Sequence, residues 1–235
     1  MNVKVIGIGG YARCGKDTFV GISKNILTKN GYKPIKIAFA DSLKEEAEKM
    51  LRESRFSATV YTEDSEVKTL IRPLLVWWGC QRRRESDGGL YWVNIADEKI
   101  HDFIDTAHNN LDEAGTDPDK LIFLISDVRF KNESTWIKET WKGEFIHLKR
   151  WSNKEVRDGY GDLGFAKVFD PAPNEEELIQ DPIIQEMADQ KVEWENKKKM
   201  TSAEAIGDPY LQSVVLETLN SIKFFKHPTT GILTL

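Results

Sequence analysis

The N-terminal run VKVIGIGGYARCGKDT is the feature that most constrains how this chain folds. Its first part, Val3 to Ile8, is short, apolar and rich in β-branched residues, which predicts a buried strand. A glycine-rich stretch over residues 10–18 follows at once, and the apolar residues after it recur at helical spacing. A strand, a glycine-rich turn and a helix in this order let backbone N–H groups and the helix N-terminus hold a phosphate. We therefore predict a phosphate-binding loop in preference to an ordinary glycine-rich turn.

The loop departs at one position from the usual pattern, G-x-x-x-x-G-K followed by Ser or Thr. Gly10, Gly15 and Lys16 match this pattern, and Lys16 is expected to reach the terminal phosphates of a nucleotide. Asp17 stands where a magnesium-binding hydroxyl is usual, and Thr18 comes one residue later. The Asp17 carboxylate either replaces that hydroxyl near magnesium, through a water, or serves as a negative charge at the helix N-terminus. We prefer the magnesium interpretation.

Strands and helices alternate beyond the loop. Apolar strands are predicted at residues 34–40, 121–126 and 144–150, with amphipathic helices between them. This alternation indicates right-handed crossovers and a parallel sheet covered by helices on both faces. The expected fold class is α/β, a three-layer P-loop NTPase fold with a helical insertion or lid.

Several local signals refine the predicted helices. Pro73 predicts a boundary or kink near the middle of one helix, because proline lacks the backbone N–H that a helix interior needs. Asp41 or Ser42 is expected to cap another helix at its N-terminus. Residues 175–200 are predicted to form a polar helix interrupted at Pro182.

Composition excludes several classes of protein. The 235-residue chain carries a formal net charge of -5, which argues against a surface built to coat nucleic acid. No apolar run approaches the roughly 20 residues that a bilayer span needs. Cys14 and Cys80 are too few for a disulfide framework and have no metal-ligand spacing. We expect a soluble cytoplasmic protein that binds neither nucleic acid nor a membrane.

Asp127 follows the clearest buried strand, within LIFLISDVRF. The carboxyl ends of parallel strands face the ligand crevice, so Asp127 is expected beside the glycine loop. An acid in that place holds magnesium directly or through a water. In the alternative interpretation Asp127 only caps a loop and Arg129 is a surface residue.

The segment IRPLLVWWGCQRRRESDGGLYWV concentrates arginines and aromatic residues. Arginine binds phosphate through two parallel N–H groups, and aromatic rings stack on bases. The segment is therefore a candidate for holding a mononucleotide, although the same aromatics suit a core and the same arginines a solvated face. Its residues of interest are Arg72, Trp77, Trp78, Arg82, Arg83, Arg84, Tyr91 and Trp92. The chain lacks an N-K-x-D motif and the H-R-D and D-F-G motifs, which argues against a GTPase and a protein kinase.

Together these stretches resemble the bacteriophage-type deoxynucleoside monophosphate kinases, a P-loop nucleotide kinase group. The matching stretches are ARCGKDT, FADSLKE, IRPLL with the WG, R, D and YWV that follow it, and DVRFKNE, all within residues 3–150. The GKDT form of the loop is itself a trait of that family. The resemblance implies ATP-dependent phosphorylation of deoxynucleoside monophosphates to diphosphates with Mg²⁺. It implies small nucleotides as partners, the host cytoplasm as location if the protein is of phage origin, and compatibility with a homodimer.

The resemblance also implies roles for individual residues. ATP and its phosphates would contact Gly10, Arg13, Cys14, Gly15, Lys16, Asp17, Thr18 and Arg150. The acceptor would contact Asp41, Lys44, Arg72, Trp78, Arg83, Trp92 and Arg129. Magnesium would lie near Asp17, Thr18 and Asp127, and catalysis would depend on Lys16, Arg72 and Arg129. Further phosphate contacts are left open among Arg82, Arg84 and Arg157.

The chain is expected to comprise three regions, and three functions are considered for it. Residues 1–150 are expected to be the P-loop kinase core with acceptor-binding helices, 151–207 a variable insertion or lid, and 208–235 a C-terminal helix returning to the core. Two alternatives to a nucleotide kinase stay open. One is another P-loop small-molecule kinase that phosphorylates a nucleoside or sugar hydroxyl, with Asp41 as base. The other is a non-catalytic ATP-binding protein whose helical tail contacts a partner.

Overall fold

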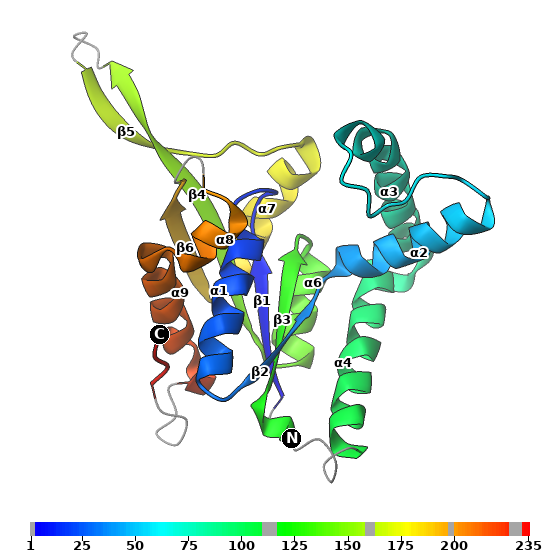
Figure 1. The fold of residues 1–235 in the computed structure, drawn as a ribbon, viewed down its shortest axis with the longest axis horizontal. Helices are drawn as coiled ribbons and strands as arrows, with labels where there is room; N and C mark the ends of the chain where they lie inside the picture. The colour runs from blue at the N-terminus through cyan, green and yellow to red at the C-terminus, as the bar shows by residue number, and fades with distance from the viewer. Residues whose placement is uncertain (1–2, 110–116, 158–162, 197–199, 226–231) are drawn as a thin grey trace. The chain divides into compact units, whose positions relative to one another are not determined.

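The computed structural model describes residues 3–109, 117–157, 163–196, 200–225 and 232–235 (Figure 1). The chain divides into two compact units. Unit 1 comprises Met1–Lys36 and Asp119–Leu235, and unit 2 comprises Ile37–Pro118. Unit 1 contains most of the sheet and the glycine loop, whereas unit 2 is mainly helical. These units do not coincide with the three regions expected from the sequence, whose separate roles stay predictions.

A six-stranded sheet forms the centre of unit 1, with strand order β2-β3-β1-β4-β5 and with β6 paired to β4. Strand β1 pairs in parallel with β3 and β4, and β6 pairs in parallel with β4. Strand β5 runs antiparallel to β4. The α/β class is thus confirmed, and the mostly parallel sheet is compatible with a P-loop fold. The strands are β1 (Lys4–Gly9), β2 (Lys33–Ile37), β3 (Leu121–Val128), β4 (Glu144–Arg157), β5 (Leu163–Phe169) and β6 (Gln190–Glu195).

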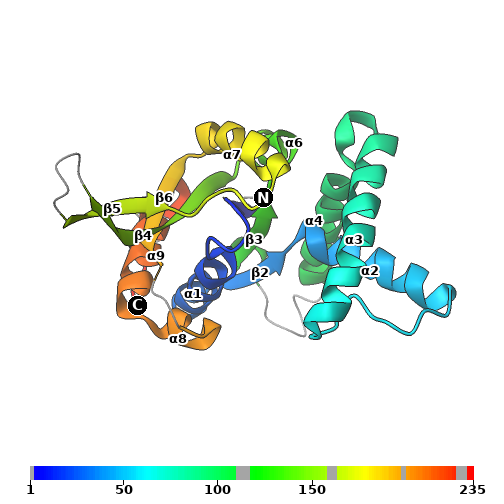
Figure 2. The ribbon, with the colours of Figure 1, turned by 90° about the horizontal axis from the view of Figure 1, so that it is seen from above.

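Helices cover both faces of this sheet, with α1, α8 and α9 on one face and α6 and α7 on the other (Figure 2). Every residue of β1 is buried, which explains its continuous apolar sequence. Ile6 and Ile8 belong to the same core cluster as Phe19 of α1 and Val215 of α9. The helices of unit 1 are α1 (Lys16–Lys29), α6 (Lys131–Thr135), the π-helical η3 (Trp136–Thr140), α7 (Glu175–Met187), α8 (Ser202–Gly207), α9 (Pro209–Ser221) and the 3-10 helix η4 (Lys223–Phe225).

Unit 2 contains three long helices around a smaller apolar cluster. Residues Ala47 and Leu51 pack there with Ile71. Of the boundary or kink predicted at Pro73, the boundary is wrong, because α3 runs through Pro73 without ending. Packing of Ile71 and its neighbours on this cluster outweighs the one helical hydrogen bond that proline cannot make. The helices are α2 (Phe39–Glu53), α3 (Ser65–Glu85), α4 (Tyr91–Asn109) and the 3-10 helix η1 (Asp87–Gly89), with η2 (Pro118–Lys120) at the junction of the two units.

The start of α2 also differs from the prediction. The helix begins at Phe39 with Ala38 as its N-cap, so Asp41 and Ser42 lie inside the first turns. Phe39 is buried, and its burial favours a start three or four residues earlier than the polar signal indicates. Asp41 still places a negative charge in the first turn, where the helix dipole favours it.

The polar helix predicted over residues 175–200 is wrong in two respects. Helix α7 runs through Pro182 without interruption, and it ends at Met187, so Gln190–Glu195 forms β6 where a helix was expected. The cause is the open side of β4, which offers a hydrogen-bonding partner to a segment whose Val192 and Trp194 alternate with polar residues. Before helix α7, β4 continues to Arg157 and pairs with β5. The lysine run 197–199 and the side chain of Arg157 lie outside the described residues.

Candidate functional site

The glycine loop lies between the end of β1 and the start of α1, as predicted. Gly10 has φ 128° and Gly15 has φ 100°, a region that side chains rarely adopt. A Cβ atom on Gly10 would lie 2.3 Å from the carbonyl oxygen of Leu148, and one on Gly15 would lie 2.5 Å from the Trp194 ring. Both glycines are therefore required by close packing as well as by backbone conformation.

Lys16 is buried at the first position of α1. Its Nζ donates hydrogen bonds of 2.8 Å to the carbonyl oxygens of Gly10 and Tyr11. The Lys16 side chain therefore links the end of the glycine loop to its first two residues. In this position the positive charge adds to that of the helix N-terminus, where an anion is favoured.

One open pocket brings together six of the residues predicted to contact ATP. About 1020 Å³ of space, including open solvent, lies among its lining atoms, which is ample for a nucleotide. Arg150 on β4 faces this pocket and also pairs with the Asp170 carboxylate. Cationic side chains thus converge beside the loop from separate parts of the chain. The predicted residues in the lining are Arg13, Gly15, Lys16, Asp17, Thr18 and Arg150, and the additional ones are Trp194, Glu195, Asn196, Met200, Thr201, Ser202, Ala205 and Leu211.

Asp17 is largely exposed at the N-terminus of α1. Its carboxylate lies 3.0 Å from the Lys36 ammonium, and 89% of its side chain is accessible. This pairing supports the helix N-terminal interpretation of Asp17. Asp17 and Thr18 also line the open pocket, so their oxygen atoms suit a magnesium ion that arrives with a nucleotide. The magnesium interpretation stays a prediction.

Asp127 lies at the carboxyl end of β3. The next residue, Val128, is paired with Gly9 at the end of β1, which places Asp127 at the sheet edge from which the glycine loop leaves. Within the described residues, no group of three or more His, Cys, Asp or Glu side chains is arranged to hold a metal ion.

Arg129 and Glu177 form an ion pair beside the glycine loop, and only Arg129 was predicted from the sequence. Arg129 was predicted, and its Nη1 atom lies 3.0 Å from the Glu177 carboxylate. Glu177 was missed, yet its other oxygen accepts a 2.6 Å hydrogen bond from the backbone N–H of Ala12 in the glycine loop. Asn174 followed three residues later by Glu177 is a local signal for a helix start, but it does not predict the contact of Glu177 with the glycine loop.

Trp194 is the other residue that the sequence analysis missed. Its indole Nε1 donates a 2.8 Å hydrogen bond to the carbonyl oxygen of Cys14. The alternation in QKVEWE is a signal that favours a strand and would have placed Trp194 on a buried face. Burial raises the pKa of the Cys14 thiol, so this cysteine stays protonated near neutral pH and is not a nucleophile.

The acceptor candidates of unit 2 fall into two groups. Trp92 is only 2% exposed and donates its indole N–H to the carbonyl oxygen of Gly79. The ring packs α4 on α3 inside unit 2, and its contact with substrate stays a prediction. Asp41 and Arg72 are exposed, whereas Lys44, Trp78 and Arg83 are partly exposed.

A single carboxylate organises the aromatic and arginine residues of this unit. Glu46 accepts hydrogen bonds from Trp78 Nε1 at 3.0 Å, from Arg82 Nε at 3.2 Å and from the Tyr91 hydroxyl. The Arg82 guanidinium also lies 4.7 Å from the Trp78 ring centre and 4.8 Å from that of Tyr91. Arg82 therefore belongs to this cluster, and the acceptor roles of Arg72 and Arg83 stay predictions.

The fold is that of an α/β protein with a glycine-rich loop at the edge of a mostly parallel sheet. No protein-family model matches the chain. It is 25% identical to phosphomevalonate kinase of Drosophila melanogaster over 177 residues, which cover 75% of this chain and 82% of that protein. The solved structure described as "Crystal structure of APE1195" aligns over 93% of this chain and 97% of its own, with 13% identity and a TM-score of 0.33, too low to carry an argument. Among the described residues, no helix has the length and apolar character to cross a bilayer.

Proposed function

We propose that this protein transfers a phosphoryl group from ATP to the phosphate group of a small phosphate ester. The observation that carries the proposal is the convergence of Arg13, Lys16 and Arg150 on the open pocket beside the glycine loop. Phosphoryl transfer needs little covalent chemistry from a protein and depends on alignment and charge stabilisation. The likeness to a kinase supports the same class of reaction.

The residues around the loop would divide the work on the donor side. Lys16 would hold the transferring phosphate, and Arg150 would contact the ATP phosphates. Magnesium would be held with the phosphates by Asp17, Thr18 and Asp127, and it would neutralise charge on the phosphate oxygens. On the acceptor side, Arg129 would bind the second phosphate.

Two acceptors are supported by separate observations. The ARCGKDT, IRPLL and DVRFKNE stretches favour a deoxynucleoside monophosphate, which would become a diphosphate. The similarity to phosphomevalonate kinase favours phosphomevalonate as the second candidate. Both acceptors present a phosphate, so neither needs a strong general base. We place the deoxynucleoside monophosphates first, because the arginine-rich and aromatic segment of unit 2 suits a base and a phosphate together.

A coupled assay of ADP release tests the proposal. The acceptors are the four deoxynucleoside monophosphates, their ribose equivalents, phosphomevalonate, nucleosides and sugars, with a reaction lacking acceptor as control. We expect one or more phosphate esters to stimulate Mg²⁺-dependent ADP release, and phosphorus NMR of the product to show a diphosphate. Stimulation by a nucleoside or sugar alone would show that the acceptor is a hydroxyl. ATP binding with no stimulation by any acceptor would favour the non-catalytic alternative.

A further inference from the structure

We infer that Glu177 is a positioning residue that links the phosphate loop to Arg129 for phosphoryl transfer. This inference rests on the proposed function for its kinetic consequences. It also assigns a role to part of the 151–207 region, to which the resemblance does not extend. Glu177, Arg129 and the loop all belong to unit 1.

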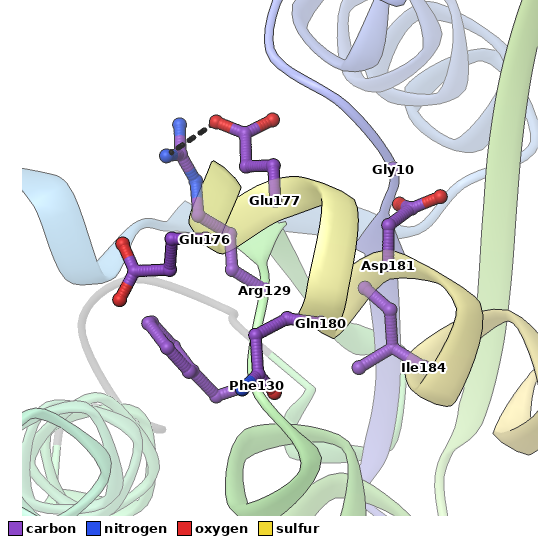
Figure 3. A pocket seen from close by; sticks show the side chains of 8 residues that line it. All are labelled: Gly10, Arg129, Phe130, Glu176, Glu177, Gln180, Asp181 and Ile184. Atoms are coloured by element: carbon purple, nitrogen blue, oxygen red, sulfur yellow. Dashed lines mark hydrogen bonds and ion pairs between the residues drawn. The ribbon is translucent and has the colours of Figure 1, made fainter. Parts of the chain in front are cut away.

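The two carboxylate oxygens of Glu177 have different partners. Oε2 accepts the Ala12 backbone N–H at 2.6 Å, and Oε1 accepts from Arg129 Nη1 at 3.0 Å. Figure 3 shows Glu177 and Arg129 joined in this way beside Gly10, on the wall of a small pocket. The Glu177 side chain is 7% exposed, so both bonds form in a poorly solvated place where charge-assisted hydrogen bonds are strong.

The position of the Glu177 carboxylate is itself built into α7. Asn174 caps this helix, with its Oδ1 accepting from the Glu177 backbone N–H at 2.8 Å and its Nδ2 lying 3.3 Å from Glu177 Oε1. The carboxylate belongs to the first turn of the helix, where the helix dipole stabilises a negative charge. Glu177 therefore reaches the loop from a fixed support.

The backbone of Arg129 is held independently of its side chain. Glu133 Oε2 accepts the Arg129 N–H at 2.7 Å and the Phe130 N–H at 3.0 Å, and Glu133 is 1% exposed. One ion pair to Glu177 then sets the direction of the Arg129 side chain. A guanidinium carries five N–H donors, so this pair orients Arg129 without exhausting its capacity to bind a phosphate. The Glu177 side chain thus fixes the position of Arg129 relative to the glycine loop.

Variants of Glu177 separate its two contacts. In Glu177→Gln the side chain keeps its size, but its single oxygen can accept from either Ala12 or Arg129 and not from both. In Glu177→Ala both contacts are lost. Glu175→Gln is the matched control, because it removes the same charge from the first turn of α7 at an exposed position.

Kinetics with the acceptor identified by the ADP-release assay form the first part of the test. We expect Glu177→Gln to lower kcat by about 10²-fold, the scale of a misplaced reacting group, and to change the KM for ATP by less than about threefold. In an Arg129→Ala background, Glu177→Gln should lower kcat by less than about threefold, because the effects of two residues that act through one another are not additive. The inference is overturned if Glu177→Gln behaves like Glu175→Gln, or if its full penalty persists without Arg129.

Hydrogen–deuterium exchange of the loop peptide, residues 10–15, forms the second part and does not depend on activity. We expect Glu177→Ala to accelerate exchange in this peptide by at least about tenfold, because the Ala12 N–H loses its acceptor. Glu175→Gln should match the wild type. An unchanged loop in a folded Glu177→Ala protein would overturn the inference whatever the catalytic activity. Faster hydrogen–deuterium exchange of the loop peptide in Glu177→Ala, in a protein that phosphorylates no acceptor, would overturn the proposed function and support the link between Glu177 and the loop.

Discussion

Trp194 of β6 donates a hydrogen bond from its indole nitrogen to the carbonyl oxygen of Cys14, 180 positions earlier in the chain, at 2.8 Å. The same ring lies against Gly15 closely enough to exclude a side chain there, and it packs 6.1 Å from the ring of Phe19. The shape of the glycine loop therefore depends on β6, a strand that is distant from the loop in sequence. Loss of this contact should be measurable as a loss of stability.

We expect Trp194→Phe to lower the free energy of unfolding by about 1–3 kcal/mol, because the buried Cys14 carbonyl oxygen loses its donor while the aromatic packing largely remains. Urea unfolding followed by circular dichroism measures the change. Trp77→Phe is the control, since Trp77 is 55% exposed, and it should alter stability by less than about 0.5 kcal/mol. Equal stabilities for both variants would show that the Trp194 hydrogen bond contributes nothing to the fold.

Lys16→Ala should lower kcat by about 10²-fold or more, the loss expected when a preorganised charge near the transition state is removed. Because Lys16 is buried and bonded to two loop carbonyls, a loss of stability of about 1 kcal/mol should accompany it. Steady-state kinetics well below the unfolding temperature separate the two effects. Lys24→Ala, an exposed lysine on the same helix, should retain wild-type turnover. A folded and fully active Lys16→Ala protein would remove the loop from the mechanism.

Asp17→Asn should raise the magnesium concentration needed for half-maximal rate, and Asp17→Ser should recover part of the difference, if the Asp17 oxygen lies in the magnesium environment. Lys36→Gln breaks the same ion pair and keeps the carboxylate, so it should leave the magnesium requirement unchanged. Titration of initial rates with Mg²⁺ measures both. Matching behaviour of the two variants, with only a loss of stability below about 1 kcal/mol, would assign Asp17 to the helix N-terminus instead.

Tyr91 should make stability depend on alkaline pH. Burial first, and then its hydrogen bond to the Glu46 carboxylate, raise the pKa of Tyr91 above the ordinary 10.0. Because the folded protein holds this proton more tightly than the unfolded chain, the stabilisation is complete below pH 10.0 and is lost as pH rises through the folded pKa. The stability advantage of the wild type over Tyr91→Phe should therefore be constant up to about pH 10 and shrink above it. Urea unfolding of both proteins across this range measures it, and an advantage independent of pH would contradict the assignment.

The sequence by itself determined the strand, the glycine loop and the helix at the start of the chain. Gly10, Gly15 and Lys16 lie within seven residues of one another, and the apolar patterns of β1 and α1 depend only on neighbours along the chain. The same reasoning placed Asp127 at the carboxyl end of β3, because the end of a long apolar run marks the end of a buried strand. Such features are local, so short-range spacing and residue type are sufficient to predict them.

Only the tertiary structure decided what supports the loop. QKVEWE becomes a strand because the open side of β4 accepts it, and that pairing brings Trp194 to the loop. Glu177 lies 165 positions from Ala12 in sequence, and its spacing from Asn174 predicts a helix start and not a contact with the loop. Its role follows from the direction in which α7 presents it. Long-range contacts of this kind depend on how distant segments pack, and that information is absent from any short stretch of the chain.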